Sequence, residues 1–219
     1  MKQLKPFRFF ECTTLLRSTG KKAQDLVQLL NLIGEVSPGV LYHHTHQYYL
    51  KASVEVPEYP NDFAVWAAEG LEERALAEKL STLDLYALTH LENVRQALME
   101  IIRSYLLENP APRPARSGEA FCFNDAVTIV AQAGSEVETL PDFIRALRTV
   151  GTSSIYFHFF EARLRLQRPF DDFSIWLETN LGRRDLARRI RRLDPYYYSL
   201  EGLRREILTL AQTEGPGGE

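Results

Sequence analysis

The sequence has 219 residues, of which 45% are hydrophobic and 25% charged, a composition typical of a globular protein with its own core. The formal net charge is −3, and neither residues 1–110 (11 basic, 14 acidic) nor residues 111–219 (15 basic, 15 acidic) have the positive excess that binding to a nucleic-acid backbone requires. No apolar run approaches the ~20 residues that span a bilayer, the N-terminus lacks a signal peptide's apolar stretch, and two cysteines are too few for a disulfide framework, so we expect a cytoplasmic protein with no membrane partner.

The chain aligns with itself. Residues 7–50 match 121–164 at a constant offset of 114, and residues 61–86 match 171–196 at an offset of 110. Both tryptophans of the chain fall in register. The identical pairs include Phe7/Phe121, Phe9/Phe123, Gly20/Gly134, Tyr42/Tyr156, His44/His158, Asp62/Asp172 and Trp66/Trp176. This pattern predicts a tandem duplication of one helical unit.

The alignment predicts the domain boundaries. Repeat 1 spans residues 1–108 and repeat 2 spans residues 119–213. Residues 109–118 contain three prolines and are expected to form an extended linker, because proline fits neither a helix interior nor a central strand. The tail, residues 214–219, is expected to be disordered.

In chain order, each repeat opens with an aromatic and β-branched stretch, Phe7–Leu16 or Phe121–Ala131, which favours a short strand, with an N-terminal helix as the alternative. Apolar periodicity then predicts four to five helices per repeat. In repeat 1 these are Leu26–Ile33, Val40–Leu50, Asp62–Gly70, 72–83 and a helix after Asp84; in repeat 2 they are Leu140–Val150, Ile155–Leu166, Asp172–Gly182, 183–193 and a helix after Asp194.

Two helix starts have side chains suited to cap them. Thr139 is expected to cap the helix from Leu140, and Thr89-x-x-Glu92 to form a capping box for the last helix of repeat 1. The predicted fold is therefore mainly α, with two tandem pseudo-symmetric helical bundles.

Histidines concentrate in one segment, Tyr42–Gln47. On a helix His43 and His46 share a face, so together they offer two metal ligands, and Asp62 or His90 is available as a third. Repeat 2 has Phe157 and Phe160 at the matching positions, which favours packing positions that accept either His or Phe.

The polar positions kept in both repeats are His44/His158 and Asp62/Asp172. A carboxylate bonded to an imidazole fixes its tautomer, so a His44–Asp62 pair and a His158–Asp172 pair are expected beside aromatic rings. The candidate ligand-binding residues are Tyr42, His44, Asp62, Trp66, Tyr156, His158, Asp172 and Trp176. The structural alternative is that Asp62 and Asp172 are helix N-caps and the histidines are core polar contacts.

Repeat 2 also carries arginines at helical spacing, Arg184, Arg188, Arg191 and Arg192. Such a stripe can bind phosphate, RNA or an acidic partner. We favour a solvated helix face, because the corresponding segment of repeat 1 carries Glu72, Glu73, Glu78 and Lys79.

Four segments resemble a family of uncharacterised prokaryotic proteins that is catalogued as a domain of unknown function. They are Phe7-Arg8-Phe9-Phe10-Glu11-Cys12-Thr13, Tyr42-His43-His44-Thr45-His46, Pro57-Glu58-Tyr59-Pro60-Asn61-Asp62-Phe63 and Ile155-Tyr156-Phe157-His158-Phe159-Phe160-Glu161-Ala162-Arg163-Leu164. The resemblance extends over nearly the whole chain and implies no activity, cofactor or catalytic residue.

These observations favour a non-catalytic binding or protein-interaction protein with two related pockets. The alternatives are a metal-dependent hydrolase using His43 and His46, and an RNA- or phosphate-binding protein using Arg184–Arg192. We expect no cofactor. The ligand is left open, as is the choice between monomer and homodimer.

Overall fold

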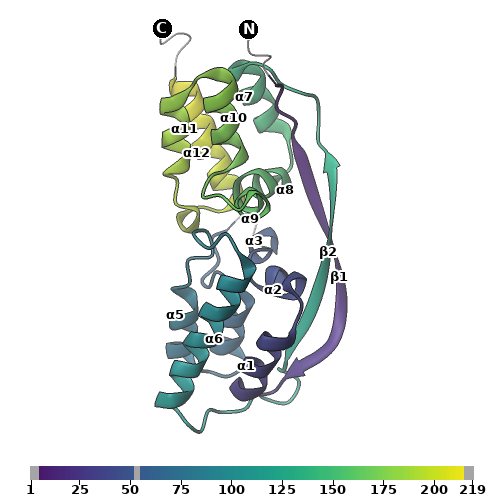
Figure 1. The fold of residues 1–219 in the computed structure, drawn as a ribbon, viewed down its shortest axis with the longest axis vertical. Helices are drawn as coiled ribbons and strands as arrows, with labels where there is room; N and C mark the ends of the chain where they lie inside the picture. Colours follow the sequence, from purple (N-terminus) through teal and green to yellow (C-terminus); the bar gives the residue numbers. More distant parts are fainter. Residues whose placement is uncertain (1–4, 52–54, 215–219) are drawn as a thin grey trace. The chain divides into compact units, whose positions relative to one another are not determined.

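A computed structural model describes residues 5–51 and 55–214, which form helices and one two-stranded sheet (Figure 1). Strands β1 (Phe10–Ala23) and β2 (Phe121–Gln132) run antiparallel. At one end Ala133 N donates to Phe9 O over 2.8 Å, and toward the other the Thr19 hydroxyl donates to Phe123 O over 2.6 Å. The expected strands are present and longer than predicted, and the helical alternative for both stretches is wrong.

The chain forms two compact units, each made from several chain segments. The N-helical unit contains Thr14–Tyr48 and Pro57–Thr128, and the C-helical unit contains Met1–Thr13, Tyr49–Val56 and Ile129–Glu219. These groupings differ from the expected ranges 1–108 and 119–213. The difference arises because the start of the chain joins the later helices and residues 119–128 join the earlier ones.

The N-helical unit holds a continuous apolar core. Its helices are α1 (Leu26–Glu35), α2 (Pro38–Thr45), α4 (Asp62–Glu69), α5 (Arg74–Ser81) and α6 (Leu91–Glu108). The helix expected over Val40–Leu50 ends at Thr45, and the short helix α3 (Tyr48–Lys51) follows it.

The C-helical unit has a comparable set of helices. They are α7 (Leu140–Thr149), α8 (Thr152–Ile155), the π-helix η1 (Tyr156–Glu161), α9 (Ala162–Leu166), α10 (Asp172–Leu181), α11 (Arg184–Arg191), the short 3-10 helix η2 (Pro195–Tyr197) and α12 (Leu200–Thr213). The predicted helix over Ile155–Leu166 is therefore present with a π-helical centre.

One of the two helix-capping predictions is confirmed and the other is wrong. Thr139 caps α7, since its side chain accepts from Asp142 N. The capping box is wrong, because α6 starts one residue later than predicted, after His90. Glu92 instead accepts from the side chains of Arg95 and Gln96.

Alternating phenylalanines join the strand segments to the helices. Phe7 and Phe9 are buried in the C-helical unit, where the Phe9 ring stacks 5.8 Å from Phe143. Phe121 and Phe123 are buried in the N-helical unit, where Phe121 stacks 4.9 Å from Phe63. Burying each such ring contributes about 1.5–3 kcal/mol, so these segments are part of each core.

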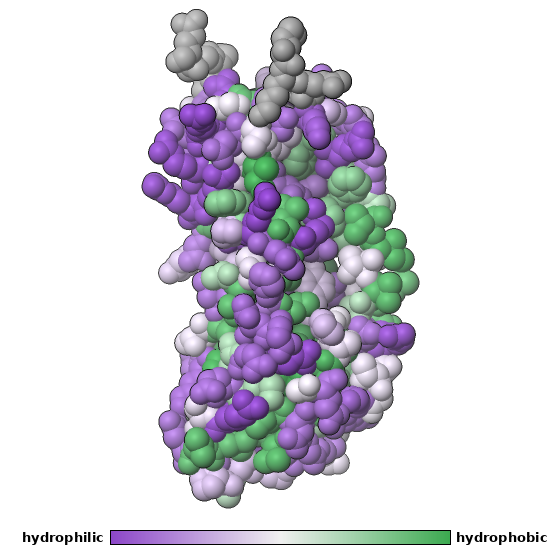
Figure 2. Space-filling model, in the orientation of Figure 1, coloured by the Kyte–Doolittle hydropathy of each residue, from purple (hydrophilic) through white to green (hydrophobic). Residues whose placement is uncertain are grey.

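The middle of the sheet is exposed. Its exposed apolar side chains are Leu15, Leu16, Val127, Ile129 and Val130. Figure 2 shows a mainly hydrophilic surface interrupted by hydrophobic areas.

None of the described helices is long and apolar enough to cross a bilayer. Residues 109–116 contain neither helix nor strand, and the expected disordered tail lies outside the described residues from 215 onward.

Replacing Phe9 by alanine tests which helices this strand segment stabilises. We expect a loss of about 3–5 kcal/mol of unfolding free energy, typical of a buried Phe→Ala change. Hydrogen–deuterium exchange should rise in α7, η1 and α10. Phe123→Ala is the matched control and should raise exchange in α1, α2 and α4 instead. Faster exchange in α1 after Phe9→Ala would contradict the assignment.

Candidate functional site

A histidine–aspartate pair lies at matching places in the two units. His44 Nδ1 is 2.8 Å from Asp62 Oδ2, and His158 Nδ1 is 2.8 Å from Asp172 Oδ2. All four side chains are buried or largely shielded, with the two imidazoles 4% and 3% exposed. The two pairs expected from the sequence therefore form.

The aspartates reach the histidines because neighbouring residues cap the helices. Asn61 accepts from Ala64 N at the start of α4, and Asp171 accepts from Ser174 N at the start of α10. The prediction that Asp62 and Asp172 are N-caps is wrong by one residue. Each is instead the first residue of its helix, where a carboxylate is also favoured by the helix dipole.

The second nitrogen of each imidazole accepts a backbone hydrogen bond from a strand. Asn124 N donates to His44 Nε2 over 2.9 Å, and Phe10 N donates to His158 Nε2 over 2.8 Å. Because Nε2 accepts, Nδ1 carries the proton and donates it to the aspartate. Both rings are thereby held as the neutral Nδ1–H tautomer.

For His158, burial also favours the neutral state. It lowers the pKa of His158 below its ordinary value, and the Asp172 carboxylate offsets only part of that shift. An imidazolium would also direct a second N–H at the N–H of Phe10. Neither ring therefore has a free nitrogen with which to move a proton.

Aromatic rings surround each imidazole. In the N-helical unit, His44 lies 4.8 Å from Phe121 and 5.8 Å from Phe63. In the C-helical unit, His158 lies 4.8 Å from Phe7 and 5.4 Å from Phe173.

The tryptophans are fixed by backbone carbonyls. Trp66 Nε1 donates to Glu119 O over 2.6 Å, and Trp176 Nε1 donates to Lys5 O over 2.9 Å. Lys5 and Glu119 are themselves related by the offset of 114. Each indole is therefore held by a backbone carbonyl that lies a few residues before a strand, since β1 begins at Phe10 and β2 at Phe121.

A pocket of about 550 Å³ opens beside the His158–Asp172 pair, within the size range of small-molecule sites. The residues that line it are Lys5, Pro6, Phe7, Arg8, Phe10, Val130, Phe157, His158, Arg165, Asp172, Ile175, Trp176, Thr179 and Asn180. We call it the C-pocket. Within it, Arg165 pairs with Asp172 over 2.5 Å and covers the ring of Phe157 at 4.8 Å.

A smaller pocket of about 290 Å³, the N-pocket, lies beside the other pair. Its lining residues are Asp62, Val65, Trp66, Glu69, Gly70, Glu119 and Ala120. Every one of them aligns with a residue of the C-pocket: Asp172, Ile175, Trp176, Thr179, Asn180, Lys5 and Pro6. The two pockets therefore occupy matching positions of the two repeat alignments.

The expected tyrosines lie elsewhere. Tyr156 is fully buried and stacks 5.9 Å from Phe160, while Tyr42 stacks 5.7 Å from His46. Neither belongs to the lining of the C-pocket or the N-pocket.

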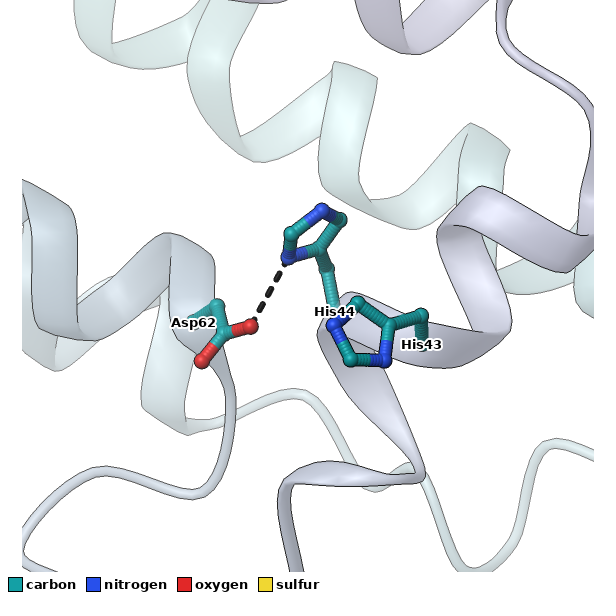
Figure 3. Close-up of side chains that lie close together, drawn as sticks. All are labelled: His43, His44 and Asp62. Atoms are coloured by element: carbon teal, nitrogen blue, oxygen red, sulfur yellow. Dashed lines mark hydrogen bonds and ion pairs between the residues drawn. The ribbon is translucent and has the colours of Figure 1, made fainter. Parts of the chain in front are cut away.

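The histidine cluster is grouped differently from the sequence expectation. Donor atoms of His43, His44 and Asp62 lie within 4.8 Å of one another (Figure 3). His46 Nε2 instead donates to Leu85 O over 3.2 Å, and its Nδ1 lies 2.8 Å from Thr45 Oγ1. A metal bound by this trio must displace the proton between His44 and Asp62.

The arginine stripe is partly neutralised. Arg188 pairs with Asp185, and Arg191 pairs with Glu178 over 2.5 Å. Arg191 also covers the ring of Phe170 at 4.4 Å. Arg188 is exposed, as expected for a solvated helix face, whereas Arg191 is largely shielded by its contacts.

Sequence reasoning missed the cations of the C-pocket. Lys5 lies two residues before the aligned block, and Arg165 lies one residue after it. Extending the alignment outward pairs Lys5 with Glu119, which is the signal that would have found the change of charge.

A family described as a family of unknown function (DUF5752) has a model that matches residues 4–212. No curated protein matches the chain. The solved structure of OrfY from Thermoproteus tenax is similar, with 29% sequence identity, a TM-score of 0.75 and 95% of each chain covered.

The pH dependence of stability should report His46. Burial lowers its pKa from 6.5 to about 4, so an unfolded chain takes up a proton between these values that the folded chain does not. This contribution is complete above pH 6.5 and is lost as the pH falls toward 4. It amounts to up to about 3 kcal/mol, at ~1.4 kcal/mol per pKa unit.

Urea denaturation at pH 7, 6, 5 and 4.5 measures the effect. His46→Phe is the matched variant, because Phe160 fills the aligned position. As the pH falls, the protein with His46 should lose unfolding free energy relative to the His46→Phe variant. Contributions from titrating groups common to both proteins cancel in this difference. A difference that stays constant with pH contradicts the buried neutral His46.

Proposed function

The chain belongs to this family of unknown function, and we propose that it is a cytoplasmic, non-catalytic binding protein whose ligand site is the C-pocket. The observation that carries the proposal is the pocket of about 550 Å³ beside Asp172 and Trp176. Its aromatic walls, combined with polar and charged groups that can orient a ligand, suit a small-molecule site. Free Cys12 and Cys122 fit a reducing compartment.

We also infer that the two pockets derive from an internal duplication. Support comes from hydrogen bonds that recur at aligned positions. The Asn124–His44 bond corresponds to the Phe10–His158 bond, and the Trp66–Glu119 bond corresponds to the Trp176–Lys5 bond. On this basis the N-pocket, at about 290 Å³, is a reduced counterpart of the ligand site.

Binding rather than catalysis is supported by the state of the imidazoles. A general base needs a ring nitrogen within reach of the substrate proton. In His158, Nδ1 is bonded to Asp172 and Nε2 to Phe10 N. The imidazole therefore forms part of the pocket wall, and neither of its nitrogens is available to accept a proton from a substrate.

The two tryptophans allow each pocket to be observed separately. Protein labelled with 5-fluorotryptophan should give two fluorine resonances, assigned with Trp66→Phe and Trp176→Phe. Screening a fragment library by fluorine NMR should shift the Trp176 resonance for a subset of compounds, because its indole lines the C-pocket.

Thr179→Phe should abolish these shifts by filling the pocket. The control is Thr209→Phe in α12. Both threonines are exposed and donate to the carbonyl four residues earlier, of Ile175 or Arg205, so the two changes are chemically alike. A library that leaves the Trp176 resonance unmoved, or shifts that persist in Thr179→Phe, rejects the C-pocket as the site.

A metal-dependent hydrolase is the second candidate, favoured by the His43, His44 and Asp62 donors that lie within 4.8 Å. Zinc would be bound there by two nitrogens and a carboxylate oxygen. Isothermal titration should then show one zinc per chain. His43→Phe should abolish binding and His46→Phe should preserve it, and both replacements copy the phenylalanines of the second repeat. Absence of stoichiometric zinc, or equal loss in both variants, removes this candidate.

A further inference from the structure

The C-pocket carries an excess of positive charge. Its described lining contains three cations, Lys5, Arg8 and Arg165, and one carboxylate, Asp172. Asp172 is paired with Arg165, and Arg8 is paired with Glu136 over 2.6 Å. The exposed Lys5 is the third cation, and its backbone N is tied to Asn180 Oδ1 over 3.0 Å, which fixes the residue at the pocket.

The N-pocket has the opposite charge at the same positions. Glu119 stands where the C-pocket has Lys5, and Glu69 stands where it has Thr179. Both pockets also contain an aspartate, Asp62 in the N-pocket and Asp172 in the C-pocket. All the charged residues in the described lining of the N-pocket are therefore acidic. Two pockets of one framework thus present opposite potentials to a ligand.

The apolar part of the C-pocket is aromatic. Trp176, Phe10 and Phe157 line it, and the Arg165 guanidinium lies over the Phe157 ring at 4.8 Å. A flat apolar group can stack among these rings while an attached anion meets the cations. Guanidinium and ammonium groups bind carboxylate and phosphate oxygens through charge-assisted hydrogen bonds.

We propose that the C-pocket selects an organic anion, a carboxylate or phosphate joined to a flat apolar group, and that the N-pocket excludes it. This inference rests on the proposed binding function and adds the chemical class of the ligand. Lys5 is the discriminating residue, because its counterpart is Glu119 and it is the pocket cation that is not already paired with a carboxylate in the described contacts.

Titration of the Trp66→Phe protein, labelled with fluorotryptophan at Trp176, tests the proposal. The probes are phenyl phosphate, benzoate, neutral benzyl alcohol and cationic benzyltrimethylammonium. Comparison of the first two separates phosphate from carboxylate as the preferred anion. At least one anion should bind about tenfold or more tighter than benzyl alcohol, a factor that corresponds to ~1.4 kcal/mol. The Trp66 resonance of Trp176→Phe should not respond to either anion.

Charge reversal at Lys5 supplies the decisive comparison. Lys5→Glu should weaken the preferred anion by about tenfold or more, because a cation becomes a carboxylate at the pocket. Lys22→Glu makes the same change at an exposed residue outside both pockets and should leave affinity unaltered.

These experiments distinguish failure of the proposed ligand class from failure of the C-pocket as a binding site. If benzyl alcohol binds as tightly as the anions, or Lys5→Glu leaves anion affinity unchanged, the selection for anions is wrong while the pocket remains a binding site. If none of the probes and no library fragment moves the Trp176 resonance, the proposed function fails together with this inference.

Discussion

The structure depends on one kind of hydrogen bond, from the backbone N–H of a strand residue to Nε2 of a buried histidine. Because the sheet has only two strands among the described residues, each strand leaves one edge without a neighbouring strand. A buried N–H without an acceptor costs about 1–3 kcal/mol. His158 accepts from Phe10 and His44 accepts from Asn124, so at this point of each strand a helix supplies the acceptor. The requirement that Nε2 accept then forces the proton onto Nδ1, and Nδ1 needs the carboxylate of Asp172 or Asp62.

This constraint determines where the pockets form. The aspartate must be the first residue of its helix, with the preceding residue as its cap, and the tryptophan follows one turn later on the same face. Its indole N–H donates to the carbonyl of Lys5 or Glu119, in the segment that leads into a strand. A floor of aromatic and carboxylate groups thus results from folding requirements alone. The residues around that floor, Thr179 against Glu69 among them, carry no such requirement and can differ between the pockets.

The sequence predicted which positions of the two repeats are equivalent better than it predicted which residues contact one another. Paired identities correctly indicated the His44–Asp62 and His158–Asp172 bonds, and apolar periodicity located most helices. The alignment could not show that Phe7 and Phe9 pack with His158 rather than His44, because both choices satisfy the same pattern of residues. The π-helix over Tyr156–Glu161 was beyond periodicity as well, since its aromatic residues suit either helix type. Asn61, Asp171 and Thr89 show that a cap is uncertain by one residue when two polar side chains are adjacent.

Residues kept in both halves are therefore weaker evidence for function here than residues that differ. Each of the two histidines joins a strand to its helices, and with both nitrogens bonded they are poorly placed for acid–base chemistry. The aligned residues differ at the edges of the two otherwise matching sites, where a substitution alters charge and size without disturbing the shared hydrogen bonds. The differing pairs are His43 and Phe157, Glu119 and Lys5, and Glu69 and Thr179. A framework whose polar groups satisfy one another leaves recognition to the groups around it. For this reason the opposite charges of the two pockets, more than the histidine–aspartate pairs that both share, would decide which ligand each proposed site binds.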